Sequence, residues 1–419
     1  MRSNHIIIIL CGLCLLSNFC WGQQNFTLQK ALYSAKQFNI QLKSERVNIE
    51  QARADVITAQ LKLNPTLNNQ SLQLMSASHL SANSDWYQNA NRQVWWQFTK
   101  QFQVAGQREN KIDLAKKNVQ LAEKNLIEYE RNLYLDVANK WLEIWTLRKQ
   151  GKIIQEAKSN IDSLVLINKL RLKNQVITET DLLRAELLAR SYFIQLQTFQ
   201  KEEESKRTEL RNLIGIDQQV QVDLTDNFLN LPTNQVDSLI QYAFENRGDY
   251  LSVQSTIESA NANVKLQKSL AIPRPEFGVI WNPQNSIPYF GLYATMPLPF
   301  FNKNQGEIQK AILQKEQYDI QAAGIQLQIK TEITVAVQRL RSQQQNLEQF
   351  EDVLNKSRQI LSNVKYAYLK GGTTIIDFLE AERSWLDNQR QYNDILQAYK
   401  QNYLQLLFTT GKINQLASE

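Results

Sequence analysis

The sequence predicts a mainly α chain in which long antiparallel coiled-coil helices are combined with four short strands that contribute to a transmembrane β-barrel. Long stretches nearly free of glycine and proline favour the helices, and four short segments between them, three of which carry aromatic residues, favour the strands. Beyond the first 22 residues, no stretch approaches the roughly 18 consecutive apolar residues that a spanning helix needs. A membrane crossing would therefore be made by strands.

The first 22 residues are typical of a signal peptide. An arginine near the start is followed by an apolar run, Ile6–Leu16, and by the small residues Cys20 and Gly22. Cleavage after Gly22 is favoured over lipid attachment at Cys20, because the bulky Phe19 directly precedes that cysteine. We expect the protein to be exported.

The sequence offers few residues of the types that catalysis usually requires. All cysteines lie in the predicted signal peptide (Cys11, Cys14 and Cys20). Of the two histidines only His79 remains, so we expect no catalytic, cofactor or metal site. The acidic pair Glu202 and Glu203 lies in a charged helical run and is interpreted as a solvated face. The net charge of +6 is spread along the chain, which does not indicate a nucleic-acid partner.

A very long helix is predicted from Gln107 to about Lys173, where Gly151 is the only glycine. Apolar or small residues recur there in steps of three and four, as in a coiled-coil seam (Ile112, Ala115, Val119, Ala122, Leu126, Tyr129 and Leu133). A helix of about 65 residues would be about 100 Å long, which suits spanning a compartment.

The chain contains two related halves, which we predict as residues 23–232 and 233–419. A shift of 208 positions superposes one set of residues (Ala35, Ala52, Val56 and Pro65 on Ala243, Ala260, Val264 and Pro273). A shift of 196 superposes another (Asp181, Ala185, Glu186, Leu210 and Gly215 on Asp377, Ala381, Glu382, Leu406 and Gly411). Each half is predicted as a helix of about 35 residues, two strands, a very long helix, a tight turn and a returning helix of about 35 residues.

Four segments have the composition of strands (Thr66–Met75, Gln93–Phe102, Glu276–Trp281 and Ile287–Thr295). Their lengths approach the roughly 9 to 11 residues of a tilted transmembrane strand. Their aromatic residues are predicted to form a belt at the membrane interfaces (Trp95, Trp96, Trp281, Tyr289 and Phe290). A water-soluble sheet with an aromatic core is the alternative. Because known barrels begin at about eight strands, several copies would have to share one barrel.

Two motifs resemble the TolC-like outer-membrane factor family. They are Met-Pro-Leu-Pro-Phe-Phe-Asn-Lys-Asn-Gln-Gly-Glu-Ile at 296–308 and Tyr-Leu-Lys-Gly-Gly-Thr-Thr-Ile-Ile-Asp-Phe-Leu-Glu-Ala-Glu at 368–382. The first resembles the family's exit from barrel to helix, and the second its periplasmic turn. The resemblance implies an outer-membrane homotrimer with a shared 12-stranded barrel and a helical tunnel in the periplasm. It also implies a passive efflux duct without cofactors, partnered by a periplasmic adaptor and an inner-membrane pump.

The second motif directs attention to the turn between the long helices. Asp377 and Glu380 would share one helix face, with Asp181 equivalent to Asp377 in the first half. The resemblance assigns such acidic residues to a periplasmic gate. The alternative is an ordinary favourable charge at a helix N-terminus, worth about 0.3 to 1 kcal/mol. Some members carry an arginine where this chain has Thr373.

The same region contains the expected turn and docking residues. Gly371 and Gly372 would permit a left-handed turn, a role that residues 175–178 would fill in the first half without glycine. By resemblance, Lys370 and Arg184 are candidates for contact with the adaptor.

Other functions stay open at this point. A periplasmic adaptor has long hairpins and strands, but only one hairpin. A soluble coiled-coil scaffold would leave the aromatic strands unexplained. Within the resemblance, the Pro-Leu-Pro-Phe-Phe-Asn motif is most similar to the heavy-metal branch (the CzcC- and CusC-like members), while drug export and type I protein secretion are the alternatives.

Overall fold

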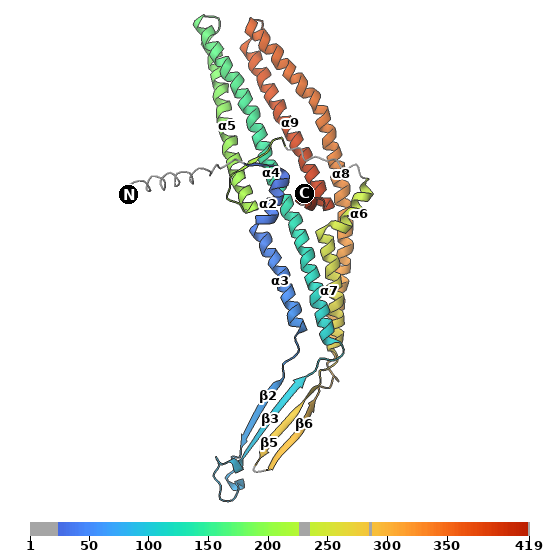
Figure 1. Ribbon diagram of the computed structural model, residues 1–419. Helices are drawn as coiled ribbons and strands as arrows, with labels where there is room; N and C mark the ends of the chain where they lie inside the picture. Colours follow the sequence, from blue (N-terminus) through green and yellow to red (C-terminus); the bar gives the residue numbers. More distant parts are fainter. Residues whose placement is uncertain (1–23, 226–234, 285–286, 418–419) are drawn as a thin grey trace, which may run out of the picture. The chain divides into compact units, whose positions relative to one another are not determined.

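The computed structural model describes residues 24–225, 235–284 and 287–417 (Figure 1). The predicted signal peptide lies outside the described residues. The chain divides into two compact units, one formed by the described parts of residues 1–43, 130–246 and 329–419, the other by residues 44–129 and 247–328.

The elements follow one another in the order β1 (Gln24–Phe26), α2 (Leu28–Phe38), α3 (Ile40–Gln60), β2 (Thr66–Gln73), η1 (Ala77–His79), η2 (Asn89–Asn91), β3 (Arg92–Gln101), α4 (Gln107–Lys173), α5 (Glu179–Ile214), β4 (Val220–Val222), α6 (Val236–Asn246), α7 (Gly248–Leu270), β5 (Glu276–Gln284), β6 (Ile287–Thr295), α8 (Gln305–Lys370), α9 (Ile375–Thr410) and α10 (Ile413–Leu416). The same succession of long elements thus occurs before and after residues 226–234.

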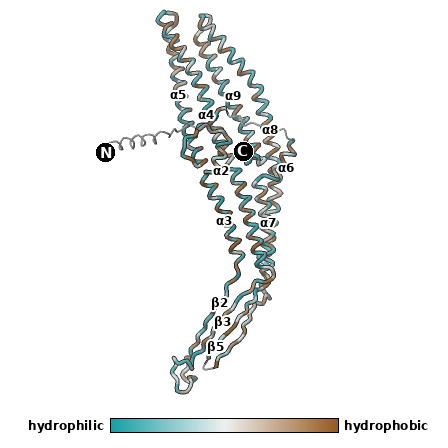
Figure 2. Tube along the Cα trace, in the orientation of Figure 1, coloured by the Kyte–Doolittle hydropathy of each residue, from teal (hydrophilic) through white to brown (hydrophobic). Residues whose placement is uncertain are grey.

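The very long helices are present as predicted. Helix α4 has 67 residues and α8 has 66, and each is followed by a returning helix of 36 residues, α5 or α9. Apolar and polar residues alternate along these helices (Figure 2). The seven predicted seam residues of α4 are all buried or half-buried. The scarcity of glycine and proline lets the helices run on, and the seam supplies the packing that stabilises them.

One sequence prediction was wrong in detail. The opening helix of each half is interrupted, at Asn39 in the first half and at Arg247 in the second, where the backbone leaves the helical conformation. Asn39 causes its break by capping the next helix, because its Oδ1 accepts from the amide of Leu42 at 2.7 Å. Its Nδ2 donates to the carbonyl of Leu213 at 2.7 Å, which ties the break to the end of α5.

A small parallel pair of strands, β1 and β4, is a feature that the sequence prediction lacked. Its strands have only three residues each, too few for a periodic signal. Trp141 of α4 is fully buried beside it and donates from Nε1 to the carbonyl of Phe26 at 2.9 Å. Gly215 ends α5 at φ +85° and faces the carbonyl of Phe38, where an added Cβ would lie 2.5 Å from the oxygen.

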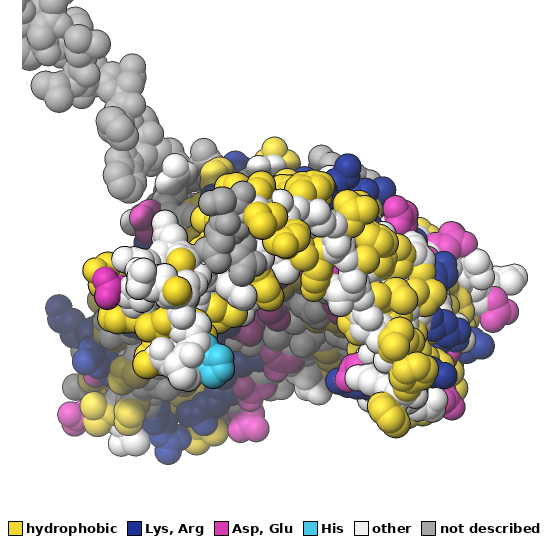
Figure 3. Space-filling model, turned by 90° about the horizontal axis from the view of Figure 1, so that it is seen from below, with side chains coloured by type: hydrophobic (Ala, Val, Ile, Leu, Met, Phe, Trp, Pro, Cys, Tyr) yellow, Lys and Arg dark blue, Asp and Glu magenta, His cyan; other side chains and the backbone are white. Residues whose placement is uncertain are grey.

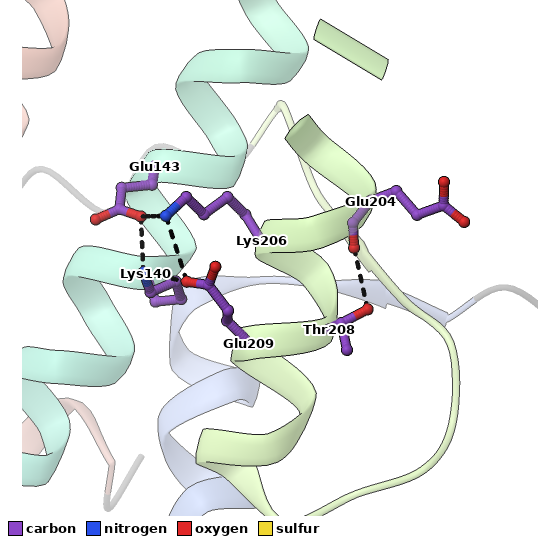
Figure 4. A network of polar contacts seen from close by, with 6 residues as sticks. All are labelled: Lys140, Glu143, Glu204, Lys206, Thr208 and Glu209. Atoms are coloured by element: carbon purple, nitrogen blue, oxygen red, sulfur yellow. Dashed lines mark hydrogen bonds and ion pairs between the residues drawn. The ribbon is translucent and has the colours of Figure 1, made fainter. Parts of the chain in front are cut away.

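Nearby, α4 and α5 are joined by a charge network (Figure 4). The ammonium group of Lys140 lies 2.9 Å from Glu143 and 2.8 Å from Glu209, and Lys206 bridges the same two carboxylates at 3.6 and 3.3 Å. These groups are partly exposed, so their effect is on the alignment of the helices more than on stability.

The second unit contains an antiparallel sheet in the order β2-β3-β5-β6. The four predicted strands are present, with β2 ending earlier than expected, β3 beginning one residue sooner and β5 continuing to Gln284. The extension of β5 is explained by its pairing with β6, which continues up to Gln284 opposite Ile287. Within the described residues, no helix is both long enough and apolar enough to cross a membrane.

Candidate functional site

The two faces of the sheet differ in chemistry. Register places Trp96 of β3, Trp281 of β5 and Phe290 of β6 in one row across three strands. Residues two positions along share their face, so the large apolar side chains gather on one side (Leu67, Trp96, Phe98, Phe277, Trp281, Phe290 and Leu292). The opposite face carries mostly polar residues (Asn68, Gln70, Gln97, Thr99, Glu276 and Thr295). Alternation of this kind is typical of a strand with lipid on one side and water on the other.

This register divides the predicted aromatic belt. Trp96, Trp281 and Phe290 lie on the apolar face, whereas Trp95 and Tyr289 lie on the polar face. Apolar side chains form a broad band in the space-filling view of the strand end (Figure 3). Phe290 is 73% exposed, so these rings are not packed into the core of a soluble sheet within this chain. The belt stays a prediction for the three residues of the apolar face.

Both edges of the sheet are open in the described part of the chain. Strand β2 pairs only with β3, and β6 pairs only with β5. Each edge therefore presents a row of backbone donors and acceptors without partners. An edge of this kind is not tolerated in a hydrocarbon environment.

The turns that close the two long hairpins have the same backbone design. In the second, Gly371 adopts φ +83°, its amide donates to the carbonyl of Tyr368, and the amide of Gly372 donates to that of Ala367. This is the Schellman pattern for ending a helix. In the first, Gln175 takes the left-handed position at φ +58°. Left-handed backbone is thus required of one residue per turn, and Gly372 is not that residue.

Each returning helix begins with a capping box. Thr178 and Thr374 are the N-caps, and their hydroxyl groups accept from the amides of Asp181 and Asp377 at 3.2 Å. The aspartates in turn accept from the threonine amides at 3.1 and 3.0 Å. Both predicted gate aspartates therefore have a structural role at a helix N-terminus.

Thr373 distinguishes the second turn from the first. Its hydroxyl donates to Asp377 Oδ2 at 2.6 Å, and the hydroxyl of Thr374 donates to the same oxygen at 2.7 Å. These bonds from Thr373 and Thr374 lower the pKa of Asp377 below its usual value. Ile177 occupies the corresponding position in the first turn and has no hydroxyl to offer.

The remaining predicted gate residue, Glu380, lies in a groove between α5 and α9. This groove has a volume of about 650 Å³ and contains several charged side chains (Arg184, Glu380, Arg383, Asp387 and Arg390). Glu380 and Arg184 are both exposed. The structure thus brings together one predicted gate residue and one predicted docking residue. Lys370 lies apart from them, with its ammonium 5.8 Å from the ring of Tyr366.

Contacts between the two hairpins were not predicted from the sequence. Arg171 of α4 donates to the carbonyls of Tyr368 and Leu369 at the end of α8, at 3.3 and 2.9 Å. The hydroxyl of Tyr368 donates to Asn168 Oδ1 at 2.7 Å in a buried bond. Arg171 thereby supplies a donor to the carbonyl of Leu369, which the helix leaves free at its C-terminus, and a second donor to that of Tyr368, which also accepts from Gly371. A contact to backbone carbonyls leaves no residue pattern by which it could be found.

A continuous apolar core lies beneath these contacts, built from all four long helices (among others Ile161 and Leu164 of α4, Leu188 and Tyr192 of α5, Leu361 and Tyr368 of α8, and Phe378, Trp385 and Leu386 of α9). The rings of Tyr368 and Phe378 are stacked, with centroids 5.7 Å apart. In the described residues there is no cluster of three or more side chains suited to holding a metal ion. His79 instead contacts Ser76 and Ser78 through Nδ1, at 2.9 and 3.0 Å.

Comparison with known proteins identifies the class. The family model described as outer membrane efflux protein matches residues 239–412. Among solved structures, CusC has a TM-score of 0.75 at 17% identity, covering 92% of both chains. A membrane protein from Pseudomonas aeruginosa reaches 0.75 at 16%, covering 92% of this chain and 93% of its own. The outer membrane protein VceC from Vibrio cholerae reaches 0.72 at 18%, covering 92% and 96%. No curated protein matched the chain in sequence.

Two helical hairpins of this length and a four-stranded sheet with one apolar face define the fold of an outer-membrane channel, and the structural matches confirm the predicted fold class. The match to the outer membrane efflux protein family over residues 239–412 agrees with the resemblance to the TolC-like factors that the two motifs predicted.

Proposed function

We propose that three copies of this chain form a passive duct, with twelve strands closing one barrel in the outer membrane and the helices extending it as a tunnel into the periplasm. The duct receives its substrate from an inner-membrane pump through a periplasmic adaptor, and catalyses no reaction.

The observation that carries this proposal is the sheet with one apolar face and two open edges. Four strands are too few to close on themselves, since barrels begin at about eight. Pairing β2 of one copy with β6 of the next satisfies both edges and generates a ring. The apolar face would then be turned to lipid and the face with Gln97 and Thr99 to the lumen.

Engineered disulfides test this arrangement directly, since the native cysteines all lie in the predicted signal peptide. Asn69→Cys on β2 is combined with single cysteines at each position from 287 to 295 on β6. A disulfide requires Cβ atoms about 3.5 to 4.5 Å apart, so only a few adjacent pairs should react. We expect trimers on a non-reducing gel for those pairs. Asn69→Cys alone is the control, and dimers formed by it would contradict a head-to-tail ring.

The gate is proposed to depend on the acidic residues at the hairpin ends, foremost Glu380. Asp377 and Asp181 are engaged in their capping boxes, whereas Glu380 is exposed in the groove and forms no hydrogen bond or ion pair within the described residues. Copies of Glu380 around a threefold axis would favour cations at the entrance. Single-channel recording should therefore show weaker cation preference for Glu380→Ala, and unchanged preference would remove Glu380 from the gate.

The adaptor is proposed to dock at the hairpin ends. The exposed side chains there include Arg184, which lines the groove between α5 and α9, and Lys370 beside the turn of Gly371 and Gly372. Their positive charge would suit acidic residues on the adaptor. Arg184→Glu should weaken cross-linking to the adaptor in cells, with Arg92→Glu on β3 of the sheet as the control. Equal cross-linking by both variants would argue against this surface.

The substrates are proposed to be heavy-metal cations, on the basis of the Pro-Leu-Pro-Phe-Phe-Asn motif at 297–302. Selection of the metal would belong to the pump. A deletion strain should lose tolerance to at least one of zinc, cobalt, cadmium and copper. Full tolerance, with sensitivity to drugs or a secretion defect instead, would replace this assignment with drug export or type I secretion.

A further inference from the structure

A carboxyl group is buried in the core where the two hairpins meet. Glu382 of α9 is 1% exposed, and its Oε1 has no hydrogen-bond partner among the described residues. The side chain of Asn160 on α4 lies beside this carboxyl and favours its ionised form. A buried carboxylate with so few partners is costly, whereas a neutral carboxyl in the same place is much less so.

The groups facing Glu382 give its negative charge little compensation. Helix α4 presents Asn160 and Glu156, of which Glu156 opposes ionisation. Helix α5 presents the hydroxyl of Tyr192, and α8 presents the exposed Lys365. No ion pair joins Lys365 to Glu382 in the part of the chain that the structure describes.

The surroundings of Glu382 contain other polar atoms without partners. The hydroxyl of Tyr192 and the indole Nε1 of Trp385 are buried and unpaired in the described structure, although both residues belong to the apolar core. Native cores rarely leave such groups unsatisfied. Together they give entering water, or a carboxylate that shifts, new hydrogen bonds to form.

We propose that Glu382 is a proton-responsive packing element: neutral, it seals the junction of α4 and α9, and ionised, it draws in water or Lys365 and loosens that junction. Since α9 carries Glu380 two residues and Asp377 five residues before Glu382, looser packing would favour opening of the duct. That last link rests on the proposed function, whereas the switch itself does not.

The direction of the pH effect follows from the carboxyl chemistry. Burial raises the pKa of Glu382 to about 7. The folded protein therefore holds this proton more tightly than the unfolded chain, where a glutamate titrates near 4.3. Folded-state stability consequently falls as the pH rises from about 4 to about 7, and stays reduced above that range.

Hydrogen exchange of the full-length mature protein in detergent tests the switch, with intrinsic exchange rates corrected at each pH. In the wild type, protection of residues 154–164 and 378–389 should fall at least about tenfold between pH 5.5 and 8.5. Glu382→Gln, which stays neutral, should remove most of that dependence. The matched control is Glu186→Gln, the equivalent position of the first half, which should keep it. The proposal would be overturned if the exchange protection of the wild type and of Glu382→Gln depended on pH in the same way.

A second measurement does not depend on a variant that folds. Infrared titration of the wild type should show a protonated carboxyl persisting at pH 6, where ordinary glutamates are ionised. If raising the pH to 5 already removed all of the protonated carboxyl signal, the proposal would be contradicted. Neither measurement involves conduction, so a failed switch is distinguishable from a failed duct.

Discussion

The ends of the two hairpins have the same backbone conformation but differ in which side chains they bury. Both turns use the Schellman pattern and both returning helices begin with a Thr-Asp capping box. In the first hairpin, Glu186 is partly exposed and forms an ion pair with Lys169 at 3.2 Å. In the second, the equivalent Glu382 is buried, while Lys365, the equivalent of Lys169, is exposed. A repeated plan therefore fixes the geometry of the turn, and the packing of one hairpin against the other decides which copies of a residue become buried.

The largest expected difference concerns the aromatic contact of the second hairpin. Phe378 is 2% exposed and stacked on Tyr368, whereas the equivalent Leu182 is half-buried. Phe378→Ala should destabilise the hairpin end by about 3 to 5 kcal/mol, and Leu182→Ala by less than about 2 kcal/mol. Hydrogen exchange of α9 and α5 amides measures both. Equal losses would mean that the two hairpins are packed alike.

The next effect concerns the buried hydrogen bond between Tyr368 and Asn168. Tyr368→Phe keeps the ring but leaves Asn168 Oδ1 without its donor, and should cost about 1 to 3 kcal/mol. Tyr366→Phe, two residues earlier and exposed, is the matched control and should change stability little. Thermal unfolding in detergent compares the two. A similar melting temperature for both would show that the bond does not hold the hairpins together.

The left-handed residue of each turn gives opposite predictions for the two hairpins. Gly371→Ala should destabilise the second turn by about 1 to 2 kcal/mol, because a Cβ is unfavourable at φ +83°. Gln175→Gly relieves the same strain in the first turn and should stabilise it by up to about 1 kcal/mol. Exchange rates at the helix ends next to each turn report the result. A loss from Gln175→Gly would show that its side chain has another role.

The smallest effect concerns the capping aspartates. Asp377→Ala should speed exchange of the amides at 374–378 more than Asp181→Ala does at 178–182, because Thr373 adds a hydrogen bond that Ile177 cannot. The lowered pKa of Asp377 means that its contribution is present above the usual range of aspartate titration and is lost as the pH falls through its own pKa. Thr373→Val should reduce the difference between the two turns, and no change would refute this explanation.

Much of the fold could be predicted because its signals are local. The lengths of α4 and α8 follow from the scarcity of glycine and the absence of proline, and three of the four strands of the sheet follow from short aromatic segments. The burial of Glu382 could not be predicted, since the same Ala-Glu pair occurs at 185–186, where the glutamate is partly exposed. The role of Arg171 was equally hidden, because its partners are backbone carbonyls 197 and 198 positions away. The division of Trp95 from Trp96 did follow from strand alternation, but only once the register was known.

The central claim, that several copies share one barrel, is tested most directly by the mass of the mature protein in detergent, measured by light scattering with the detergent contribution subtracted. The account predicts a mass of three chains. A monomer that stays soluble without detergent would contradict it, because the open edges of β2 and β6 and the exposed apolar face of the sheet would then have no membrane role.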